Sequence, residues 1–337
     1  VQTLTKRYTR QLERMNRLKS DDVLDKTLNA MMLTYDPHSN YFPPVDAMEL
    51  NRQTTLQLEG IGVSIRPERG NEDYTKIETI VEGGPASKTG QVKSGDRIIG
   101  VAQDGEKMVD VVGWPSNEIV GLIRGKRGTK VTVRLLATGA PMSQARNVTI
   151  VRDVIQEEDA GVRSRVVEVK RDGKVHRMGV IEIPSFYLNY RARRAGNEYR
   201  SVSEDTNNAL KELQTKNVEG IIIDLRNNPG GSLEEVARML GQVIKSGPVV
   251  QIRDGNGNVS VFEDDDNGAQ TYAGPLAVMV NLASASASEI YSAAIQDYER
   301  GIVIGSTTTG KGTAQVQLDN LAHGQATLTQ RKFYRVT

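Results

Sequence analysis

The feature that most constrains the fold of this chain is a strand–helix–strand pattern near its C-terminal end. An apolar run, Leu276–Leu282, predicts a strand; a helix-like segment, Glu289–Arg300, follows it, and Gly301–Gly305 predicts a second short strand. Two strands joined through a helix normally lie parallel in one sheet, with a right-handed crossover between them. The pattern therefore predicts an α/β fold with a parallel sheet.

Candidate reactive side chains follow both predicted strands. Ser284, Ser286 and Ser288 come after the first strand, and Lys311 comes after the second. Ligands of open α/β sheets bind beyond the carboxyl ends of the strands, so we expect a serine nucleophile and a lysine base to share one crevice. The pattern alone does not choose among the three serines. Ser286 with Glu289 also fits a capping box, a purely structural role.

The composition of the chain limits the other possible nucleophiles and bases. It contains no cysteine, which excludes a cysteine nucleophile and a zinc thiolate site, and none of its three histidines lies in the strand–helix–strand unit. A lysine acts as a base only when it is neutral. Its reference pKa of about 10.4 must then fall by roughly 3 units, or about 4 kcal/mol. The small residues Gly310 and Gly312 permit close packing around the Lys311 side chain.

A second glycine turn points to the same edge of the sheet. Val218–Leu225 reads as a buried parallel strand, and the turn after it ends in Gly230 and Gly231. Ser232 then caps a predicted helix, Leu233–Lys245. Backbone amides in such a turn can stabilise a developing oxyanion. Taken alone, the same residues also fit an ordinary connection between a strand and a helix.

The residues around Ser286 and Lys311 resemble those of the C-terminal processing peptidases. The resemblance lies in Ser-Ala-Ser286-Ala-Ser-Glu and in Gly-Lys311-Gly-Thr-Ala-Gln315, and it covers most of the chain from Asp36 onward. Further segments that resemble the family are Asp36–Tyr41, Ser185–Tyr187, Asp224–Gly231 and Lys332–Val336. The family resemblance implies an α/β core of the crotonase/Clp-protease type with parallel-strand βαβ units, and neither a cofactor nor a metal.

The same resemblance implies a role for each site residue. Ser286 would be the nucleophile and Lys311 the general base, with Gln315 orienting the lysine amine. The oxyanion hole would be formed by backbone amides, those of Ala287 and of Gly230 or Gly231.

Asp297 matches an aspartate that is often counted among the catalytic residues of this family. Eleven residues along a helix span about 16 Å. If Ser286 and Asp297 lie on one helix, their side chains therefore cannot touch. We predict a structural role for Asp297, near the C-terminal end of the helix.

The chain divides into three predicted parts, residues 1–54, 55–152 and 153–337. The first part is helical and packs on the peptidase core formed by the third. Its apolar residues recur at spacings of three and four, which is typical of amphipathic helices. They are Leu4, Tyr8, Leu12, Met15 and Leu18 in one helix, and Leu24, Leu28 and Met31 in the next.

The middle part resembles a PDZ domain inserted between the other two. A glycine loop at Gly60–Gly62 runs into a strand, and a helix near residues 115–123 and a strand at 130–136 follow. In that binding mode a peptide adds as a strand to a sheet edge. The amides of Gly60, Ile61 and Gly62 would hold the terminal carboxylate, with Ile61 and Val63 near an apolar pocket. The alternative is a small β domain that binds nothing.

Charge and hydropathy add limits on partners and location. The net charge is +1, from 43 basic and 42 acidic residues, which gives no support for a nucleic-acid partner. No apolar run approaches the roughly 18 residues of a membrane span. The chain begins at Val1 without a methionine or a signal peptide and ends just after a strand-like segment. We expect it to be a trimmed piece of a longer protein, truncated at both ends.

Together these features predict a Ser-Lys serine endopeptidase that recognises apolar, unstructured C-terminal tails through its PDZ domain. The family resemblance implies a periplasmic enzyme that processes or degrades cell-envelope proteins, and it allows for association with the inner membrane and for an adaptor lipoprotein. Two alternatives stay open. One is a catalytically inactive PDZ scaffold, and the other is an acyl-thioester enzyme of related fold.

Overall fold

The computed structural model describes residues 20–68, 70–156, 160–196, 199–263, 270–319 and 321–336. The helix predicted for Leu4–Leu18 lies outside these residues. The chain forms two compact units: the large unit, Val1–Thr55 with Asp159–Thr337, and the small unit, Leu56–Glu158. No helix among the described residues is both long and apolar enough to span a lipid bilayer.

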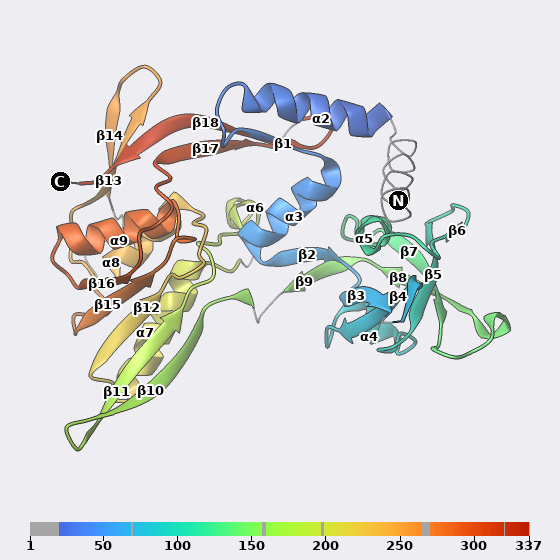
Figure 1. The fold of residues 1–337 in the computed structure, drawn as a ribbon, viewed down its shortest axis with the longest axis horizontal. Helices are drawn as coiled ribbons and strands as arrows, with labels where there is room; N and C mark the ends of the chain where they lie inside the picture. The colour runs from blue at the N-terminus through green and yellow to red at the C-terminus, as the bar shows by residue number, and fades with distance from the viewer. Residues whose placement is uncertain are drawn as a thin grey trace, which may run out of the picture. The chain divides into compact units, whose positions relative to one another are not determined.

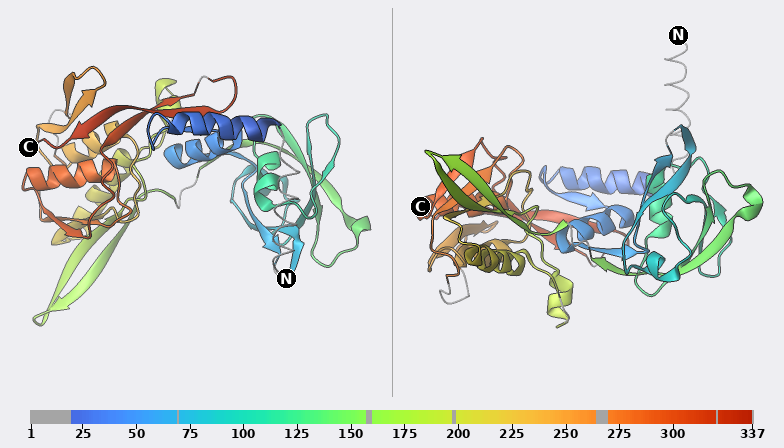
Figure 2. Two further views of the ribbon diagram at one scale, coloured as in Figure 1. Left: turned by 45° about the horizontal axis from the view of Figure 1, so that its top comes forward. Right: turned by 90° about the horizontal axis from the view of Figure 1, so that it is seen from below.

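The main sheet of the large unit is largely parallel. Its strands, in spatial order, are β10 (Arg163–Arg171), β11 (Lys174–Glu182), β12 (Gly220–Asp224), β15 (Leu276–Val280) and β16 (Ile302–Gly305). β10 and β11 form an antiparallel hairpin that extends beyond the other strands, as Figures 1 and 2 show. β11, β12, β15 and β16 are parallel neighbours. The predicted strand–helix–strand unit is therefore confirmed.

Three helices connect the parallel strands: α7 (Val202–Thr215), α8 (Leu233–Gly241) and α9 (Ala287–Asp297). Helix α7 packs on β10 and β11, α8 lies between α7 and α9, and α9 packs on β16. A further short helix, α6 (Tyr190–Arg194), precedes α7. Helix α8 ends four residues before the predicted Lys245, and Leu240, at that end, accepts the backbone N–H groups of Val243 and Ile244. These elements bring the turns after β12, β15 and β16 to one edge of the sheet.

A second sheet of the large unit includes a strand from the N-terminal segment. Its path is β1 (Asn40–Phe42), β18 (Gln325–Tyr334), β13 (Pro248–Asp254) and β14 (Val259–Glu263), with β17 (Thr313–Leu318) also paired to β18. Helix α9 contacts β13 as well as β16, so it lies between the two sheets (Figure 1). The sequence predicted only helices for this segment. The pairing of β1 with β18 joins residues too far apart for any local pattern to indicate.

Two helices flank β1. Helix α2 (Ser20–Leu33) confirms the second predicted helix. Helix α3 (Pro44–Thr55) was not predicted, because the pair Pro43-Pro44 reads as a break in structure. Proline is favoured in the first turn of a helix, where its missing N–H would have no partner, and this is the position that Pro44 takes.

The small unit is built on an antiparallel sheet and has its own core. Its strands, in order, are β3 (Val63–Glu68), β4 (Asn71–Ile80), β5 (Arg97–Gln103), β7 (Lys130–Leu136) and β8 (Arg146–Val151), with β6 (Val109–Asp110) beside β5. Strands β2 (Gln57–Gly60) and β9 (Asp153–Gln156) pair with each other. The helices are α4 (Pro85–Thr89), α5 (Ser116–Ile123) and the 3₁₀ turn η1 (Met142–Gln144).

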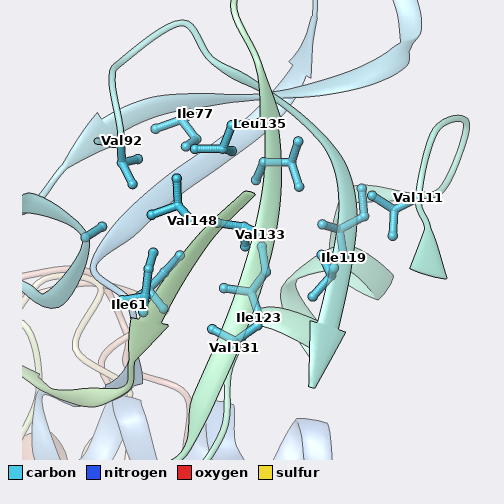
Figure 3. Packing of buried hydrophobic residues seen from close by; sticks show 14 residues of the cluster. Ile61, Ile77, Val92, Val111, Ile119, Ile123, Val131, Val133, Leu135 and Val148 are labelled. Atoms are coloured by element: carbon cyan, nitrogen blue, oxygen red, sulfur yellow. The ribbon is translucent and has the colours of Figure 1, made fainter. Parts of the chain in front are cut away.

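Fourteen buried apolar residues form one cluster inside the small unit (Figure 3). Ile98, Ile119 and Val131 are completely buried there. Burying such a side chain contributes about 1.5–3 kcal/mol. The cluster therefore supplies this unit with a hydrophobic core of its own.

Candidate active site

Ser286 stands at a strained turn between β15 and α9. It immediately precedes α9, and its backbone angles are φ 53° and ψ −111°, which residues other than glycine rarely adopt. Such strain persists only where the surroundings fix the backbone. Here the N–H of the preceding residue, Ala285, donates a hydrogen bond of 3.0 Å to the carbonyl oxygen of Asn228. The turn after β12 thus supports the turn that carries Ser286.

Burial distinguishes the three candidate serines. Ser284 and Ser288 are completely buried. The Ser284 hydroxyl donates to the carbonyl oxygen of Leu225 at 2.8 Å, and the Ser288 hydroxyl donates to that of Asn228 at 3.1 Å. Ser286 is partly exposed. Of the three, Ser286 is therefore the one whose side chain is accessible to a substrate.

Asn228 organises the glycine turn, and the sequence did not indicate this. Its side chain is completely buried. The Nδ2 group donates to the carbonyl oxygen of Ile183 at 2.9 Å, and Oδ1 accepts the N–H of Gly230 at 2.8 Å. An Asn-Asn-Pro sequence before two glycines suggests a turn, but the partner Ile183, which directly follows β11, is known only from the fold. Because the Gly230 N–H is bound to Asn228, it is not available to an oxyanion.

The two glycines of this turn allow close approach between three segments. A Cβ on Gly230 would lie 2.8 Å from the Cβ of Ser286 and 3.1 Å from the Ala287 nitrogen. A Cβ on Gly231 would lie 2.3 Å from the carbonyl oxygen of Phe186. The Phe186 backbone also binds both sides of the turn, donating to the Gly230 oxygen at 2.9 Å and accepting the N–H of Ser232 at 2.8 Å.

Two amides remain as candidate oxyanion donors, those of Ala287 and Gly231. Neither N–H group has a hydrogen-bond acceptor among the described residues. The Ala287 nitrogen also begins α9, where the helix dipole favours negative charge. Of the sequence-predicted alternatives, the geometry therefore favours Gly231 over Gly230.

Glu289 connects the Ser286 turn with the Lys311 loop. Its Oε2 atom accepts the backbone N–H of Ser286 at 2.8 Å, as the predicted capping box requires, and that of Lys311 at 2.9 Å. Its Oε1 atom accepts the N–H of Gly310 at 2.6 Å and the hydroxyl of Thr308 at 2.7 Å. The sequence indicated the first contact and missed the others, because they join the two ends of the strand–helix–strand unit.

Lys311 lies in surroundings that weaken its hold on a proton. Burial lowers the pKa of its ammonium group, while the negative charges of Asp36 and Glu289 act in the opposite direction and only partly offset burial. A lowered pKa is what a lysine base requires. No hydrogen bond joins Ser286 Oγ to Lys311 Nζ among those of the described residues. Catalytic hydrogen bonds often tighten only when substrate binds.

Gln315 lies on β17 and its amide is held by two threonines. The Nε2 group donates to the hydroxyl of Thr313 at 3.0 Å and to that of Thr329 at 2.9 Å. Both of its N–H groups are thereby used, which leaves Oε1 as the atom that can accept a hydrogen bond from an amine. That Gln315 orients Lys311 stays a prediction.

Asp297 lies at the end of α9 opposite Ser286. Its carboxylate forms an ion pair with Arg335, whose Nε donates to Oδ1 at 3.1 Å, and only 5% of the Asp297 side chain is exposed. Arg335 directly follows β18. The ion pair therefore ties the C-terminal end of α9 to the second sheet. This geometry accords with a structural role, which stays a prediction.

The predicted tail-binding residues run from the end of β2 into β3 in the small unit. Gly60 ends β2, Gly62 has a φ of 77°, and Val63 begins β3. β3 is one of the two edge strands of the main path of the sheet, and α5 packs beside it. The Ile61 side chain is only 2% exposed and belongs to the core cluster in Figure 3. It therefore offers a ligand its backbone and not an open apolar surface.

Three families match this chain. The family described as "Peptidase family S41" matches residues 177–336, the "PDZ domain" family matches residues 49–136, and the "Tail specific protease N-terminal domain" family matches residues 1–45. The tail-specific protease of Haemophilus influenzae is 41% identical over 99% of this chain and 46% of its own length. The carboxy-terminal processing protease CtpA of Bacillus subtilis is 32% identical over 88% of this chain and 57% of its own length.

A solved structure of a photosystem II D1 C-terminal processing protease is also similar, with 25% identity, a TM-score of 0.48, and coverage of 94% of this chain and 78% of that one. The chain spans about half the length of the curated relatives named above. The S41 match covers the turns that carry Gly230, Ser286 and Lys311 and the strand that carries Gln315. This chain belongs to peptidase family S41 and combines the S41 peptidase fold with a PDZ domain.

Proposed function

We propose that this protein is a serine endopeptidase that cleaves peptide bonds with Ser286 and Lys311 and selects substrates by their C-terminal tails. The observation that carries the proposal is the Glu289 carboxylate, one oxygen of which binds the backbone N–H groups of both Ser286 and Lys311. This contact ties a partly exposed serine to the loop of a lysine whose pKa is lowered by burial.

The mechanism follows from the chemistry of these groups. Ser286 attacks the peptide carbonyl carbon while neutral Lys311 accepts the hydroxyl proton. The N–H groups of Ala287 and Gly231 stabilise the oxyanion. Lys311 then gives its proton to the leaving amine, and water hydrolyses the acyl-enzyme. The Oε1 atom of Gln315 orients the lysine amine during both transfers.

The small unit would bind the tail of the substrate. An extended peptide adds to the free edge of β3 beside α5, and the Ile61 and Gly62 amides hold its terminal carboxylate. Suitable substrates are proteins with apolar, unstructured C-termini. We further propose that these are cell-envelope proteins met in the periplasm. An adaptor lipoprotein and association with the inner membrane stay predictions from the family resemblance.

The catalytic assignment is tested by single substitutions. Ser286→Ala and Lys311→Ala should each remove nearly all cleavage of a short peptide, with the melting temperature little changed. Ser288→Ala is the matched control: it removes one buried hydrogen bond of about 1 kcal/mol but no reacting group. If Lys311→Ala retained more than about a tenth of the wild-type rate, a change below about 1.4 kcal/mol in the barrier, lysine would not be the base.

The tail assignment is tested with two versions of one substrate. Amidation of the C-terminus removes the charge and its charge-assisted hydrogen bonds, together worth roughly 1.5–3 kcal/mol, so processing should slow about tenfold or more. Equal rates for amidated and free-acid tails, below saturation, would refute tail recognition. Tail binding without any cleavage by the wild-type protein would instead support an inactive scaffold.

A further inference from the structure

The N-terminal segment brings a carboxylate close to the candidate active site. Asp36 lies in the turn before β1, and β1 pairs antiparallel with β18, with Tyr41 opposite Ala326. The hydroxyl of Ser39, which is completely buried, accepts the backbone N–H of Thr329 at 3.1 Å. This pairing fixes the Asp36 turn against β18. Strand β18 is in turn the neighbour of β17, and β17 carries Gln315.

A chain of hydrogen bonds leads from Asp36 to Gln315. The Thr329 hydroxyl donates to Asp36 Oδ1 at 2.8 Å and accepts the Gln315 Nε2 group at 2.9 Å. A hydroxyl has one hydrogen, and here the carboxylate takes it, because an ionised carboxylate can only accept. The lone pairs of Thr329 are then left for an N–H donor. Asp36 therefore determines that Gln315 turns its nitrogen toward Thr329 and keeps its Oε1 atom free.

The charge of Asp36 also acts on Lys311. The carboxylates that raise the pKa of Lys311 against the effect of burial are Asp36 and Glu289. The pKa of Asp36 is itself lowered, first by the hydrogen bond from Thr329 and then by that from the His38 backbone, with smaller effects from the charges of His38 and Lys311. Asp36 is therefore ionised throughout the pH range in which Lys311 would work.

We propose that Asp36 is a positioning residue of the active site, which orients the amide of Gln315 through Thr329 and uses its charge to moderate the loss of the proton from Lys311. The proposal rests on Lys311 being the base. It assigns two separable effects to one carboxylate. The hydrogen bond between Thr329 and Asp36 fixes the orientation of the Gln315 amide. The negative charge of Asp36 affects the pH range over which Lys311 is neutral and the enzyme is active.

The charge is removed by Asp36→Asn. Among the described residues, the two hydrogen bonds to the Asp36 carboxylate, from the Thr329 hydroxyl and the His38 N–H, both end on Oδ1, and asparagine retains an oxygen there. Loss of the negative charge favours the neutral lysine. The rising limb of kcat/KM against pH should therefore move to lower pH, while the alkaline plateau stays within about twofold of wild type. Asp46→Asn, which removes an exposed carboxylate from α3, is the control and should leave the limb in place.

The hydrogen-bond bridge is removed by Thr329→Val, which leaves the charge of Asp36. The plateau value of kcat should fall about three- to tenfold, the usual effect of one lost hydrogen bond, with KM for a short peptide unchanged. Thr329→Ser restores the hydroxyl and should restore kcat. A merely structural role would lower the melting temperature in both threonine variants and move neither kcat nor the limb.

A titration that does not depend on activity separates this proposal from the assignment of the base. In Ser286→Ala protein with ¹³C-labelled lysine, the Cε signal of Lys311 is identified by its absence after Lys311→Arg. Its titration midpoint should fall when Asp36→Asn is added. An unchanged midpoint would overturn the proposal. A lowered midpoint together with full activity of Lys311→Ala would overturn the base assignment instead and leave the charge effect of Asp36 standing.

Discussion

The two glycine turns of this protein present backbone amides in opposite ways. In the large unit, a Cβ on Gly230 or Gly231 would meet neighbouring atoms at 2.8 and 2.3 Å. In the small unit, the nearest atom to a Cβ on Gly60 is 3.9 Å away, and that to one on Gly62 is 3.5 Å away, an ordinary contact. The first turn needs glycine both because it is packed against other segments and because φ is 103° at Gly230 and 145° at Gly231. The second needs it for backbone conformation at Gly62, where φ is 77°.

This difference fits the two proposed ligands. An oxyanion exists only briefly and is stabilised best by donors that are already rigid. A peptide tail arrives as an added strand and needs an open edge. The comparison teaches that close packing and positive φ are two distinct physical reasons for a glycine in such a turn, and that substitution of Gly62 tests the second reason alone.

The largest effect is expected for Gly230→Ala. The new methyl group would collide with Ser286 and Ala287 and move the nucleophile away from its donors. We expect kcat for a short, tail-free peptide to fall by about 100-fold or more, as for loss of an oxyanion donor. Steady-state kinetics with circular dichroism as a check on folding would measure this. A loss below about fivefold would mean that the turn tolerates displacement.

The cleavage rate, which depends on the large unit, should vary with pH, whereas tail binding by the small unit should not. The lowered pKa of Lys311 means that its charged form, favoured at low pH, is lost as pH rises, so activity should appear on the alkaline side of that pKa. Below it, the rate should change about tenfold per pH unit. Tail affinity, measured by titration with a labelled peptide, should lack this limb. Lys311→Arg should abolish it, since arginine stays charged in this range; a limb that persisted would belong to another group.

A smaller effect is expected for Gly62→Ala. A non-glycine residue at positive φ costs about 1–2 kcal/mol, so tail affinity should weaken about fivefold or more, or the melting temperature of the small unit should fall. Cleavage of tail-free peptides should not change. A loss of that cleavage equal to the loss for tailed substrates would show that the two turns are coupled.

The smallest effect is expected for Gly60→Ala. Gly60 does not belong to the described glycines with positive φ, and the atom nearest to a Cβ built on it is the Cγ of Arg124 at 3.9 Å. Tail affinity should stay within about twofold, a change below about 0.4 kcal/mol. A strong loss here would contradict the view that this turn is open.

Local patterns predicted the elements that carry the site. Apolar runs indicated β12, β15 and β16, and the serine, lysine and glycine signals each follow one of these strands or its neighbouring turn. The parallel pairing then required those signals to meet at one edge. For this reason the three serines, Lys311 and the Gly230–Gly231 turn could be placed at one edge before the structure, whereas the choice of Ser286 among the serines came from the family resemblance.

Contacts between distant segments were not predictable in the same way. The bonds from Glu289 to the Lys311 loop, those of Asn228, and the link from Asp36 to Thr329 depend on how separate elements pack. The sequence marked Asp36 only as the start of a segment that resembles the family. The residues around Asp36 and Pro37 carry no pattern that would indicate packing against β18.

The pairing of β1 with β18 has a consequence for biosynthesis. Asp36 and Thr329 are separated by 293 positions. A ribosome that adds 5–20 residues per second needs roughly 15–60 seconds to cover that distance. Gly230 is made about two thirds of the way through this interval, and Ser286 and Lys311 are made only near its end, shortly before Thr329. The Asp36 turn therefore waits through nearly the whole synthesis of the chain for the strand against which it packs, and the candidate site is assembled only in the last few seconds.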